Sequence, residues 1–267
     1  MNANLQAAVD QSYVLRADRD GIATVTLNRG DRLNPLSMAM LDAMQQTMDQ
    51  IAQDSTVKVV VLAGGGKHFC AGHDLREMRA NPSKAWQTDL FERCSKMMLT
   101  LTAISQPVIA RIQGVAVAAG CQLVSMCDLA VASENAQFAL PGIKSGIFCT
   151  TPGVGVARNV ARKHAMEMLL TGDVIDAKTA ERFGLINHVV PLAELDAAID
   201  RLAKKIAAHS GAVVGMGKSY FYKQIEMGLA GAYDLAAEGM ACNMMLDDAG
   251  EGIDAFLAKR TPNWRDR

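Results

Sequence analysis

The sequence has no excess of either charge and no long apolar run. Its 267 residues include 27 Lys and Arg against 28 Asp and Glu, which gives a net charge of −1. A nucleic-acid-binding domain normally carries a basic stripe, so we expect no nucleic-acid partner. No apolar run reaches the roughly 18 residues that a transmembrane helix needs, so we expect no membrane-spanning segment. The segment from Met1 to Ser12 contains neither Lys nor Arg and no apolar core, unlike a signal or transit peptide, and this favours a cytoplasmic location.

Cysteine is also scarce, and the usual cofactor motifs are absent. None of the six cysteines forms a Cys-x-x-Cys pair, which predicts reduced, mostly buried thiols rather than a disulfide framework or a zinc site. Gly64-Gly65-Gly66-Lys67 lacks the glycine spacing of a phosphate-binding loop, and Gly153-x-Gly155 lacks the third glycine of a dinucleotide fingerprint. His68 and His73 are not at the spacing of a metal pair on one helix face. We therefore expect no metal.

Strand and helix signals alternate through the first two-thirds of the chain. Ser37 is placed to cap a helix whose apolar face recurs every three or four residues, at Leu41, Met44, Met48 and Ile51. Strands are expected at 22–27, 57–63, 107–112 and 129–132, and most of these are continuous apolar runs. This alternation predicts an α/β fold in one large domain with largely parallel sheets.

The last third of the sequence reads as helical. Helices are expected at 192–209, 212–227, 230–247 and 251–259. We place a boundary between a core, residues 1–207, and a C-terminal helical region, residues 208–267. The helical region is short and apolar, so it should pack on the core or on a neighbouring subunit.

Two segments rich in small residues each follow an apolar strand. The first runs from His68 to Leu75, and the second runs from Gln113 to Leu123, entering a helix expected to start near Ala119. A helix N-terminus offers free N–H groups and a positive dipole end. Two such amides from separate loops can stabilise one developing oxyanion. The alternative is that the small residues only permit close packing of helix and strand.

These segments belong to a longer series of motifs. Asn28-Arg29, Leu33-Asn34-Pro35-Leu36, Phe69 to Leu75, Ala119-Gly120-Cys121, Cys127-Asp128 and Gly184-Leu185-Ile186 follow one another along the chain. In order and spacing they resemble the enoyl-CoA hydratase/isomerase (crotonase) superfamily from about residue 20 to the C-terminus. Gly-His-Asp-Leu, Ala-Ala-Gly-Cys-Gln-Leu and Phe-Cys-x-Thr-Pro-Gly-Val resemble its branch of enoyl-CoA hydratase domain-containing protein 3.

The resemblance implies a fold, a substrate and an assembly. The core would be a crotonase-like spiral of repeated ββα units, with a C-terminal helical region used for trimerisation. The partner would be an acyl-CoA thioester of fatty acid metabolism, with coenzyme A as part of the substrate and no further cofactor. The protein would be a homotrimer or a dimer of trimers.

The resemblance also assigns site residues. The N–H groups of His73 and Ala119 would form the oxyanion hole. The residues expected to bind substrate are Arg32, Leu33, Ala71, Asp74, Leu75, Gly120, Pro141 and Gly142. Lys218 would approach the CoA phosphates; the alternative is a solvated surface lysine.

The sequence departs from the hydratase pattern at both acid–base positions. Gln122 and Gly142 stand where hydratases of this family carry two glutamates. Neither residue exchanges a proton near neutral pH, and each positioned acid or base typically contributes about 10²–10⁴-fold. We expect an enzyme with weak or altered hydratase chemistry, and we expect Gln122→Glu with Gly142→Glu to raise hydration.

Several alternatives remain open at this stage. The chain is alternatively a non-catalytic acyl-CoA-binding protein, or it uses Cys149 as a nucleophile, against a buried and inert Cys149. His73 either turns its imidazole toward the acyl group or packs as an ordinary side chain. Gln122 is a candidate to orient water or to bind a polar group of the substrate. Asp74 either lines the site or caps the next helix.

Overall fold

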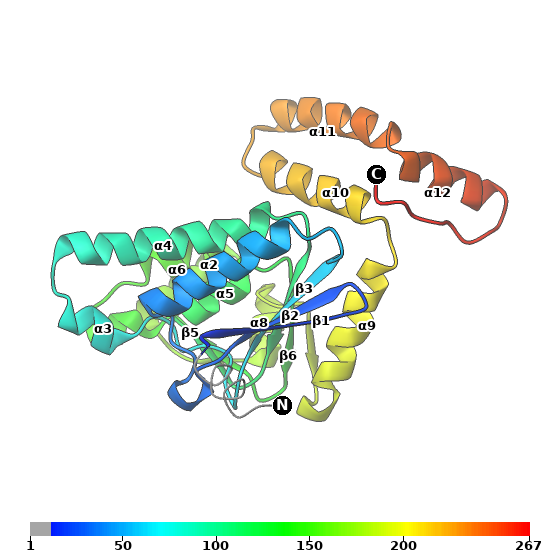
Figure 1. The fold of residues 1–267 in the computed structure, drawn as a ribbon. Coiled ribbons are helices and arrows are strands. Elements are labelled where there is room, and N and C mark those ends of the chain that lie inside the picture. The colour runs from blue at the N-terminus through cyan, green and yellow to red at the C-terminus, as the bar shows by residue number, and fades with distance from the viewer. Residues whose placement is uncertain (1–11) are drawn as a thin grey trace.

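A computed structural model describes residues 12–267 of the chain. The prediction made from Met1 to Ser12 therefore lies almost wholly outside the described residues. Two sheets form the centre (Figure 1). The large sheet has the order β1 (Val14–Arg19), β2 (Ile22–Leu27), β3 (Val59–Gly64), β4 (Val108–Ile112), β6 (Leu129–Ser133) and β9 (His188–Val190). The small sheet has the order β5 (Val115–Val117), β7 (Gln137–Ala139) and β8 (Ile175–Asp176).

The predicted parallel sheet is confirmed. From β2 to β9 every pair in the large sheet is parallel, and only β1 runs antiparallel to β2. The apolar runs expected as strands are β2, β3, β4 and β6, with starts shifted by two residues at most. In β3 all six residues are buried, as expected for a strand covered on both faces.

Successive strand pairs place one strand in each sheet. β4 joins the large sheet and β5 the small one, and helix α5 (Ala119–Met126) follows; β6 and β7 repeat the arrangement before α6 (Thr150–Asn159). After β3, Cys70 forms an isolated parallel bridge with Ala116 of the small sheet. These are the ββα repeats that the family resemblance implied.

Two apolar layers cover the large sheet, one on each face. On one face lie α2 (Met38–Ala52), α4 (Lys84–Ala103) and α5, with Met44, Met48 and Leu101 fully buried. The predicted cap is confirmed, because the Ser37 side chain accepts from Met40 N–H. On the other face, α9 (Leu195–Ala207) packs Leu195 and Ile199 against Val59 and Val61, and Figure 1 shows α9 on the side away from α2 and α4.

The remaining helices frame this centre. They are η1 (Gly30–Arg32), α3 (Leu75–Ala80), η2 (Pro141–Ser145), α7 (Arg162–Thr171), α8 (Ala177–Phe183) and η3 (Leu192–Glu194). The C-terminal region comprises α10 (Gly211–Gln224), α11 (Leu229–Met244) and α12 (Asp247–Leu257), which stand out from the core in Figure 1. The expected boundary at 207/208 falls at the last residue of α9.

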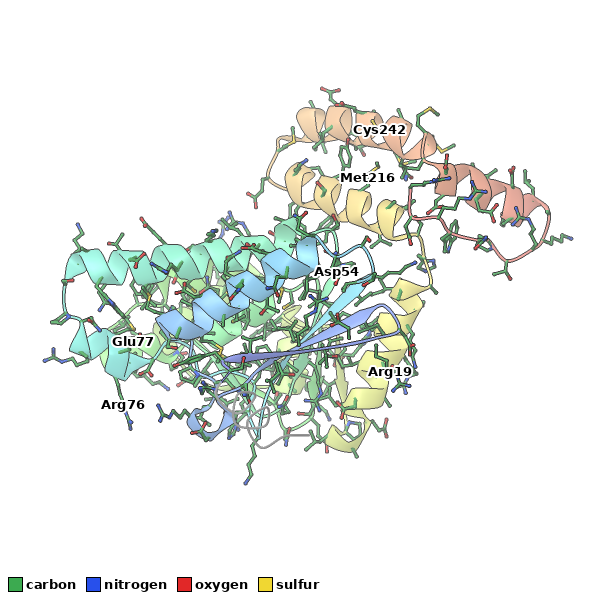
Figure 2. The ribbon with its side chains drawn as sticks, in the orientation of Figure 1. Arg19, Asp54, Arg76, Glu77, Met216 and Cys242 are labelled. Carbon is green, nitrogen blue, oxygen red and sulfur yellow. The ribbon has the colours of Figure 1, made fainter. Side chains whose placement is uncertain are left out.

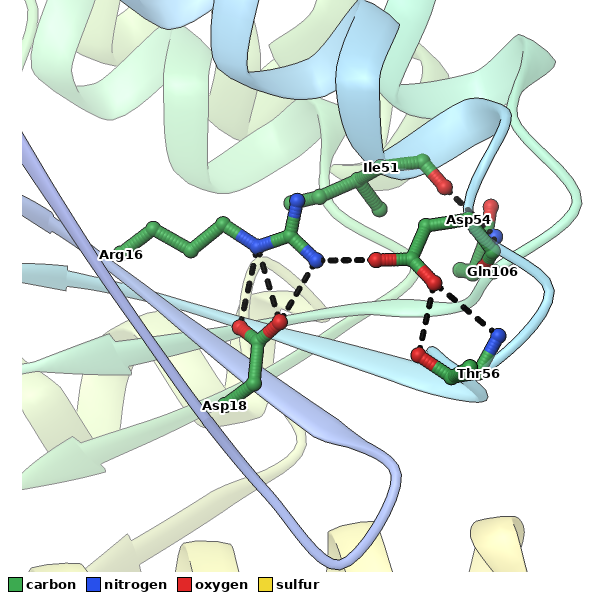
Figure 3. Close-up of polar contacts among 6 residues, drawn as sticks. All are labelled: Arg16, Asp18, Ile51, Asp54, Thr56 and Gln106. Carbon is green, nitrogen blue, oxygen red and sulfur yellow. Dashed lines mark hydrogen bonds and ion pairs between the residues drawn. The ribbon is translucent and has the colours of Figure 1, made fainter.

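A polar cluster ties the first strand to the loop after α2 (Figure 3). Arg16 donates to both Asp18 and Asp54, and Asp54 accepts from the hydroxyl and the N–H of Thr56. The hydrogen bonds from Thr56 and Arg16 hold the pKa of Asp54 below its ordinary value. Gln106, also in Figure 3, donates to Ile51 O and so fixes the end of α2.

All six cysteines are free. Cys70, Cys94, Cys121, Cys127 and Cys149 are buried, whereas Cys242 on α11 is exposed and is labelled in Figure 2. In residues 12–267 no helix is both long and apolar enough to cross a bilayer. Over the same residues no three His, Cys, Asp or Glu side chains converge as metal ligands would.

Candidate functional site

The two segments rich in small residues meet in space. Cys70 N–H donates to Val115 O and Val117 N–H donates to Cys70 O, so the segment after β3 runs alongside β5. Gly72 has φ +89°, and a Cβ placed on it would lie 3.0 Å from Ala119 N and 2.9 Å from Ala118 Cβ. Only glycine permits this close approach. The peptide before His73 is thereby held next to the start of α5.

Neither the N–H of His73 nor that of Ala119 has an acceptor among the described residues. Ala119 is the first residue of α5, where helix amides lack an internal partner. Its neighbour Ala118 has φ 50° and ψ −121°, a conformation that L-residues rarely adopt. Such strain costs about 1–3 kcal/mol and is found at functional sites. Here it sets the orientation of the peptide whose N–H belongs to Ala119.

His73 and Ala119 both line a cavity of about 850 Å³. Ten of the sequence-predicted site residues line it: Arg32, Leu33, Ala71, His73, Asp74, Leu75, Ala119, Pro141, Gly142 and Cys149. Sequence reasoning missed several others that line it, among them Arg76, Met78, Phe91, Lys144 and Phe148. Three of the lining residues are cations, Arg32, Arg76 and Lys144, and Figure 2 shows Arg76 projecting away from the ribbon.

The mouth of the cavity is shaped by a strained turn. Leu33 and Asn34 both have positive φ, 65° and 50°, and Leu33 O accepts from Ala71 N–H. Asn34 is fully buried, and its Nδ2 lies 3.0 Å from each of three carbonyl oxygens, those of Gly65, His68 and Phe69. Its Oδ1 accepts from Arg29 N–H. One amide side chain therefore holds the loop that carries His73.

Asp74 is a helix cap. Its carboxylate accepts from the N–H groups of Arg76 and Glu77 at the start of α3. Glu77, labelled in Figure 2, accepts in turn from Met38 N–H and so ties α3 to α2. Asp74 lines the cavity and also caps α3, through its Oδ1, as the alternative predicted.

His73 is held as a neutral imidazole. Leu36 O can only accept, so the Nδ1 3.0 Å from it carries the proton. Burial lowers the pKa of His73, against the raising effect of the Leu36 hydrogen bond. Nε2 is then a lone-pair acceptor, and it is buried with no partner among the described residues. Phe91 meets the ring edge-to-face, with centroids 5.5 Å apart.

Of the two positions that depart from the hydratase pattern, Gly142 lines the cavity and Gln122 does not. Gln122 is one turn along α5, 4% exposed, with its Oε1 buried and unpartnered in the described chain. Gly142 lies in the cavity wall, and a Cβ on it would be 2.4 Å from Ile147 O and 2.8 Å from Cys149 Sγ. A side chain at position 142 therefore requires the backbone at Ile147 to shift, and the gain in hydration expected from Gln122→Glu with Gly142→Glu stays a prediction.

Cys149 lines the cavity at the N-terminus of α6. Burial raises the pKa of its thiol, although a hydrogen bond from the Gly142 backbone lowers it in part. Net elevation disfavours the thiolate, which is the nucleophilic form. The environment favours the interpretation of Cys149 as a buried neutral thiol.

Two sequence-predicted binding residues are corrected. Lys218 is buried on α10, and its Nζ donates to Leu101 O, Gln106 O and Asp128 Oδ2 at 2.7, 2.9 and 2.7 Å. An ammonium has three N–H groups, so none remains for a phosphate, and the surface alternative is wrong too. Gly120 is absent from the cavity lining; a Cβ on it would lie 2.1 Å from Cys70 O, so it serves helix–strand packing.

The comparisons with known proteins show the family and the fold. The family model described as enoyl-CoA hydratase/isomerase matches residues 17–267. The chain belongs to the enoyl-CoA hydratase/isomerase family, and its crotonase-like fold is confirmed: it superposes on an enoyl-CoA hydratase of Mycobacterium smegmatis with a TM-score of 0.93 and 51% identity, covering 94% of this chain and 98% of that one.

The narrower resemblance is confirmed as well. Human enoyl-CoA hydratase domain-containing protein 3, mitochondrial, is 45% identical over 92% of this chain and 81% of its own length. The crystal structure of that human protein superposes with a TM-score of 0.92 and 44% identity, covering 94% of this chain and all of the other. The name of this relative places it in mitochondria, and the cytoplasmic location of the present chain stays a prediction.

Proposed function

We propose that this protein binds an acyl-CoA thioester with its carbonyl oxygen between the N–H groups of His73 and Ala119. The observation that carries the proposal is the pair of amides without acceptors, brought together in one cavity by Gly72 and by the strained Ala118. A thioester oxygen gains negative charge when the acyl group reacts, and fixed N–H dipoles stabilise that charge. The cations Arg32, Arg76 and Lys144 suit the phosphates of coenzyme A.

We propose further that hydration of enoyl-CoA is weak. Hydration needs groups that take a proton from water and return one. The two carboxylates that line the cavity are Asp31 and Asp74, and Asp74 is engaged as a cap. Asp31 lies on the exposed η1 turn beside Arg32. Gln122 offers only an amide.

The chemistry that this arrangement supports best is proton transfer at an enolised acyl group. His73 presents a neutral imidazole with an unoccupied Nε2 beside its own amide. The buried Oε1 of Gln122 lacks a donor in the described chain, and such an atom costs about 1–3 kcal/mol unless a ligand or water supplies one. We assign Gln122 to a hydrogen bond with the substrate or a bound water. Non-catalytic acyl-CoA binding remains the alternative, since the same amides would serve it.

The oxyanion contact is tested by comparing ligands. Butyryl-CoA and its thioether analogue S-butyl-CoA differ only in the carbonyl, so the hole should bind the thioester about tenfold or more tightly, at roughly 1.4 kcal/mol per tenfold. The carbonyl stretch of a bound unsaturated acyl-CoA should shift to lower frequency as the bond is polarised. Equal affinity for the thioester and the thioether, with no shift of the carbonyl stretch, would contradict the proposed oxyanion hole.

The chemistry is tested by turnover. Crotonyl-CoA hydration should be several orders of magnitude slower than in a hydratase that has both carboxylates. Exchange of the acyl α-protons with deuterated water reports proton transfer, and His73→Asn, which keeps a donor for Leu36 O, should abolish it while leaving thioester binding intact. Ordinary hydratase turnover would show that the acid and base were misplaced. Binding without any exchange in the wild type would select the non-catalytic alternative.

A further inference from the structure

A second cavity, of about 1010 Å³, lies on the α9 face of the large sheet. Loops after β3, β4 and β6 surround it, each at the carboxyl end of a parallel strand, where α/β sheets commonly bind ligands. It shares no lining residue with the cavity that holds Ala119. The proposed function uses none of its side chains.

The acidic residues that line this cavity have cationic partners within the protein, whereas one lysine that lines it has no partner among the described residues. Its two acidic residues are neutralised within the protein: Asp196 accepts from Arg111, and Asp200 accepts from Lys204 at 2.8 Å. Lys67, by contrast, has no ion-pair or hydrogen-bond partner among residues 12–267 for its ammonium group. A cation without an internal partner leaves the cavity electropositive at this end.

Two further donors lack partners beside Lys67. His68 Nδ1 accepts from Val115 N–H at 3.2 Å, so the proton of the neutral ring is on Nε2, which has no acceptor in the described chain. Asn135 accepts from Ser133 through Oδ1, which leaves its Nδ2 group unused within the same residues. An ammonium, an imidazole N–H and an amide NH₂, all three donors, are thus unpaired at this end within the described chain. The exposed amide of Gln137, which also lines the cavity, has no side-chain partner in residues 12–267 either and offers both a donor and an acceptor.

The rest of the lining is mixed, because Thr24, Thr26, Gln113 and Gln137 line the cavity together with an apolar part. In the apolar part, Ile22 and Val61 lie on the face of the large sheet that α9 covers. Ile199 and Ala203 come from α9, and Leu192 comes from the turn before it. The cluster of Lys67, His68 and Asn135 suits an anionic head, and the apolar part of the lining suits an aliphatic body.

We propose that this cavity is a second ligand site, which takes an organic oxyanion: a carboxylate or phosphate head bound by Lys67, His68 Nε2–H and Asn135, on an aliphatic body lying over Ile22, Val61 and Ile199. Charge-assisted hydrogen bonds to the head provide selectivity, and the apolar floor provides contact area. The site is separate from the proposed thioester site, so it stands whether or not that proposal does.

The test uses three probes of one chain length on the full-length protein: octanoate, octyl phosphate and octanol. Binding is measured by calorimetry with and without butyryl-CoA, and any anion binding that butyryl-CoA abolishes is assigned to the other cavity. We expect one equivalent of octanoate or octyl phosphate to bind and octanol to bind at least tenfold more weakly. The tighter of the two anions identifies the natural head group. Binding of octanol as tight as that of both anions, or no binding of either anion, would overturn the proposal.

Three variants locate the binding. Lys67→Met keeps the length of the side chain and removes its charge. His68→Asn keeps an acceptor for Val115 N–H and removes the Nε2–H donor. Each should weaken anion binding about fivefold to tenfold, while Lys84→Met, on the exposed start of α4, should leave it unchanged. Thr24→Phe, on the cavity face of β2, should block binding by filling the space. Anion binding that survives Lys67→Met, His68→Asn and Thr24→Phe unchanged would refute this site.

Discussion

The core and the C-terminal helices bury their side chains in opposite ways. In the core, α2 alone buries Met40, Leu41, Met44, Met48 and Ile51. In α10, α11 and α12 together, the buried residues are Gly215, Lys218, Gly239, Asp248 and Ala255, none of them a large hydrophobic residue. Yet half of the exposed large hydrophobic side chains of the described chain lie from Phe221 onward, including Phe256 at 82% and Leu229 at 76% exposure. The core is complete by itself, whereas the tail presents apolar surface that needs another surface to cover it.

The comparison is tested most strongly by the assembly state. We expect the wild type to form a trimer or hexamer through α10–α12, and Leu229→Glu with Phe256→Glu to give a monomer. Each side chain loses about 1.5–3 kcal/mol of burial, so association should weaken on the order of 10²–10⁴-fold. Sedimentation measures this. Leu99→Glu, at a leucine on α4 that is 62% exposed, is the control and should leave assembly intact. A wild type that stays monomeric at micromolar concentration would contradict the prediction.

The second-largest effect is expected at the ion pair that connects the C-terminal helices to the core. Lys218 on α10 pairs with Asp128 of the core, and their side chains are only 6% and 15% exposed. Lys218→Met leaves a buried carboxylate without its cation, which should cost about 3–5 kcal/mol of unfolding free energy in urea. Lys223→Met, at an exposed position of the same helix, should cost little, and adding Asp128→Asn to Lys218→Met should recover part of the loss. A loss below about 1 kcal/mol for Lys218→Met would mean that the tail does not depend on this pair.

Thiol labelling compares the two regions directly. Burial raises the pKa of Cys121 to about 12, and it also raises that of Cys149. Cys242, exposed on α11, should alkylate at neutral pH on the order of a hundredfold faster than either, since the thiolate is the reactive form. In the Leu229→Glu, Phe256→Glu variant it should react faster still if assembly shields the tail. Rapid labelling of Cys149 that butyryl-CoA suppresses would instead revive its role as a nucleophile.

The smallest effect is expected in how the stability of the protein changes at acidic pH. The folded pKa of His73 lies below its ordinary 6.5, so the unfolded chain binds the extra proton, and stability falls as pH drops below 6.5. In the tail, the pKa of Glu251 is lowered from 4.5 to about 2 by Arg260 and by Asn263 N–H, so its contribution is lost only between those values. As the pH is lowered, the free energy of unfolding should therefore fall first because His73 in the core titrates, and only at lower pH because Glu251 in the tail does. His73→Asn should flatten the slope near pH 6; an unchanged slope would assign it to other groups.

The sequence predicted most where local patterns decide the structure. The Ser37 cap, the apolar face of α2, the start of α5 and the strands all follow from spacing within a short window. The two segments rich in small residues were found for the same reason. Their meeting could be inferred only from the family resemblance, because Cys70 pairs with Ala116 through the fold rather than through the sequence.

The sequence was least informative about contacts that depend on how the backbone folds back on itself or on other segments. Lys218 meets Asp128 across 90 positions, and no local pattern distinguishes such a lysine from a solvated one. Gly142 was interpreted as a missing side chain, but its turn places Ile147 O where a Cβ would be. Arg76 and Lys144 reach the cavity from α3 and η2, and only the packing of those elements reveals them.

The amide of Asn34 has a consequence for how the protein ages. Asparagine side chains are lost slowly in solution when the nitrogen of the next residue attacks the amide carbon and closes a ring. The residue after Asn34 is Pro35, whose nitrogen carries no hydrogen and cannot close that ring to a neutral succinimide. Conversion to aspartate would set a carboxylate against the carbonyls of Gly65, His68 and Phe69 and release the loop that carries His73. The Asn34 amide, which holds the loop that carries His73, thus stands before a proline, where chemical deamidation is slow.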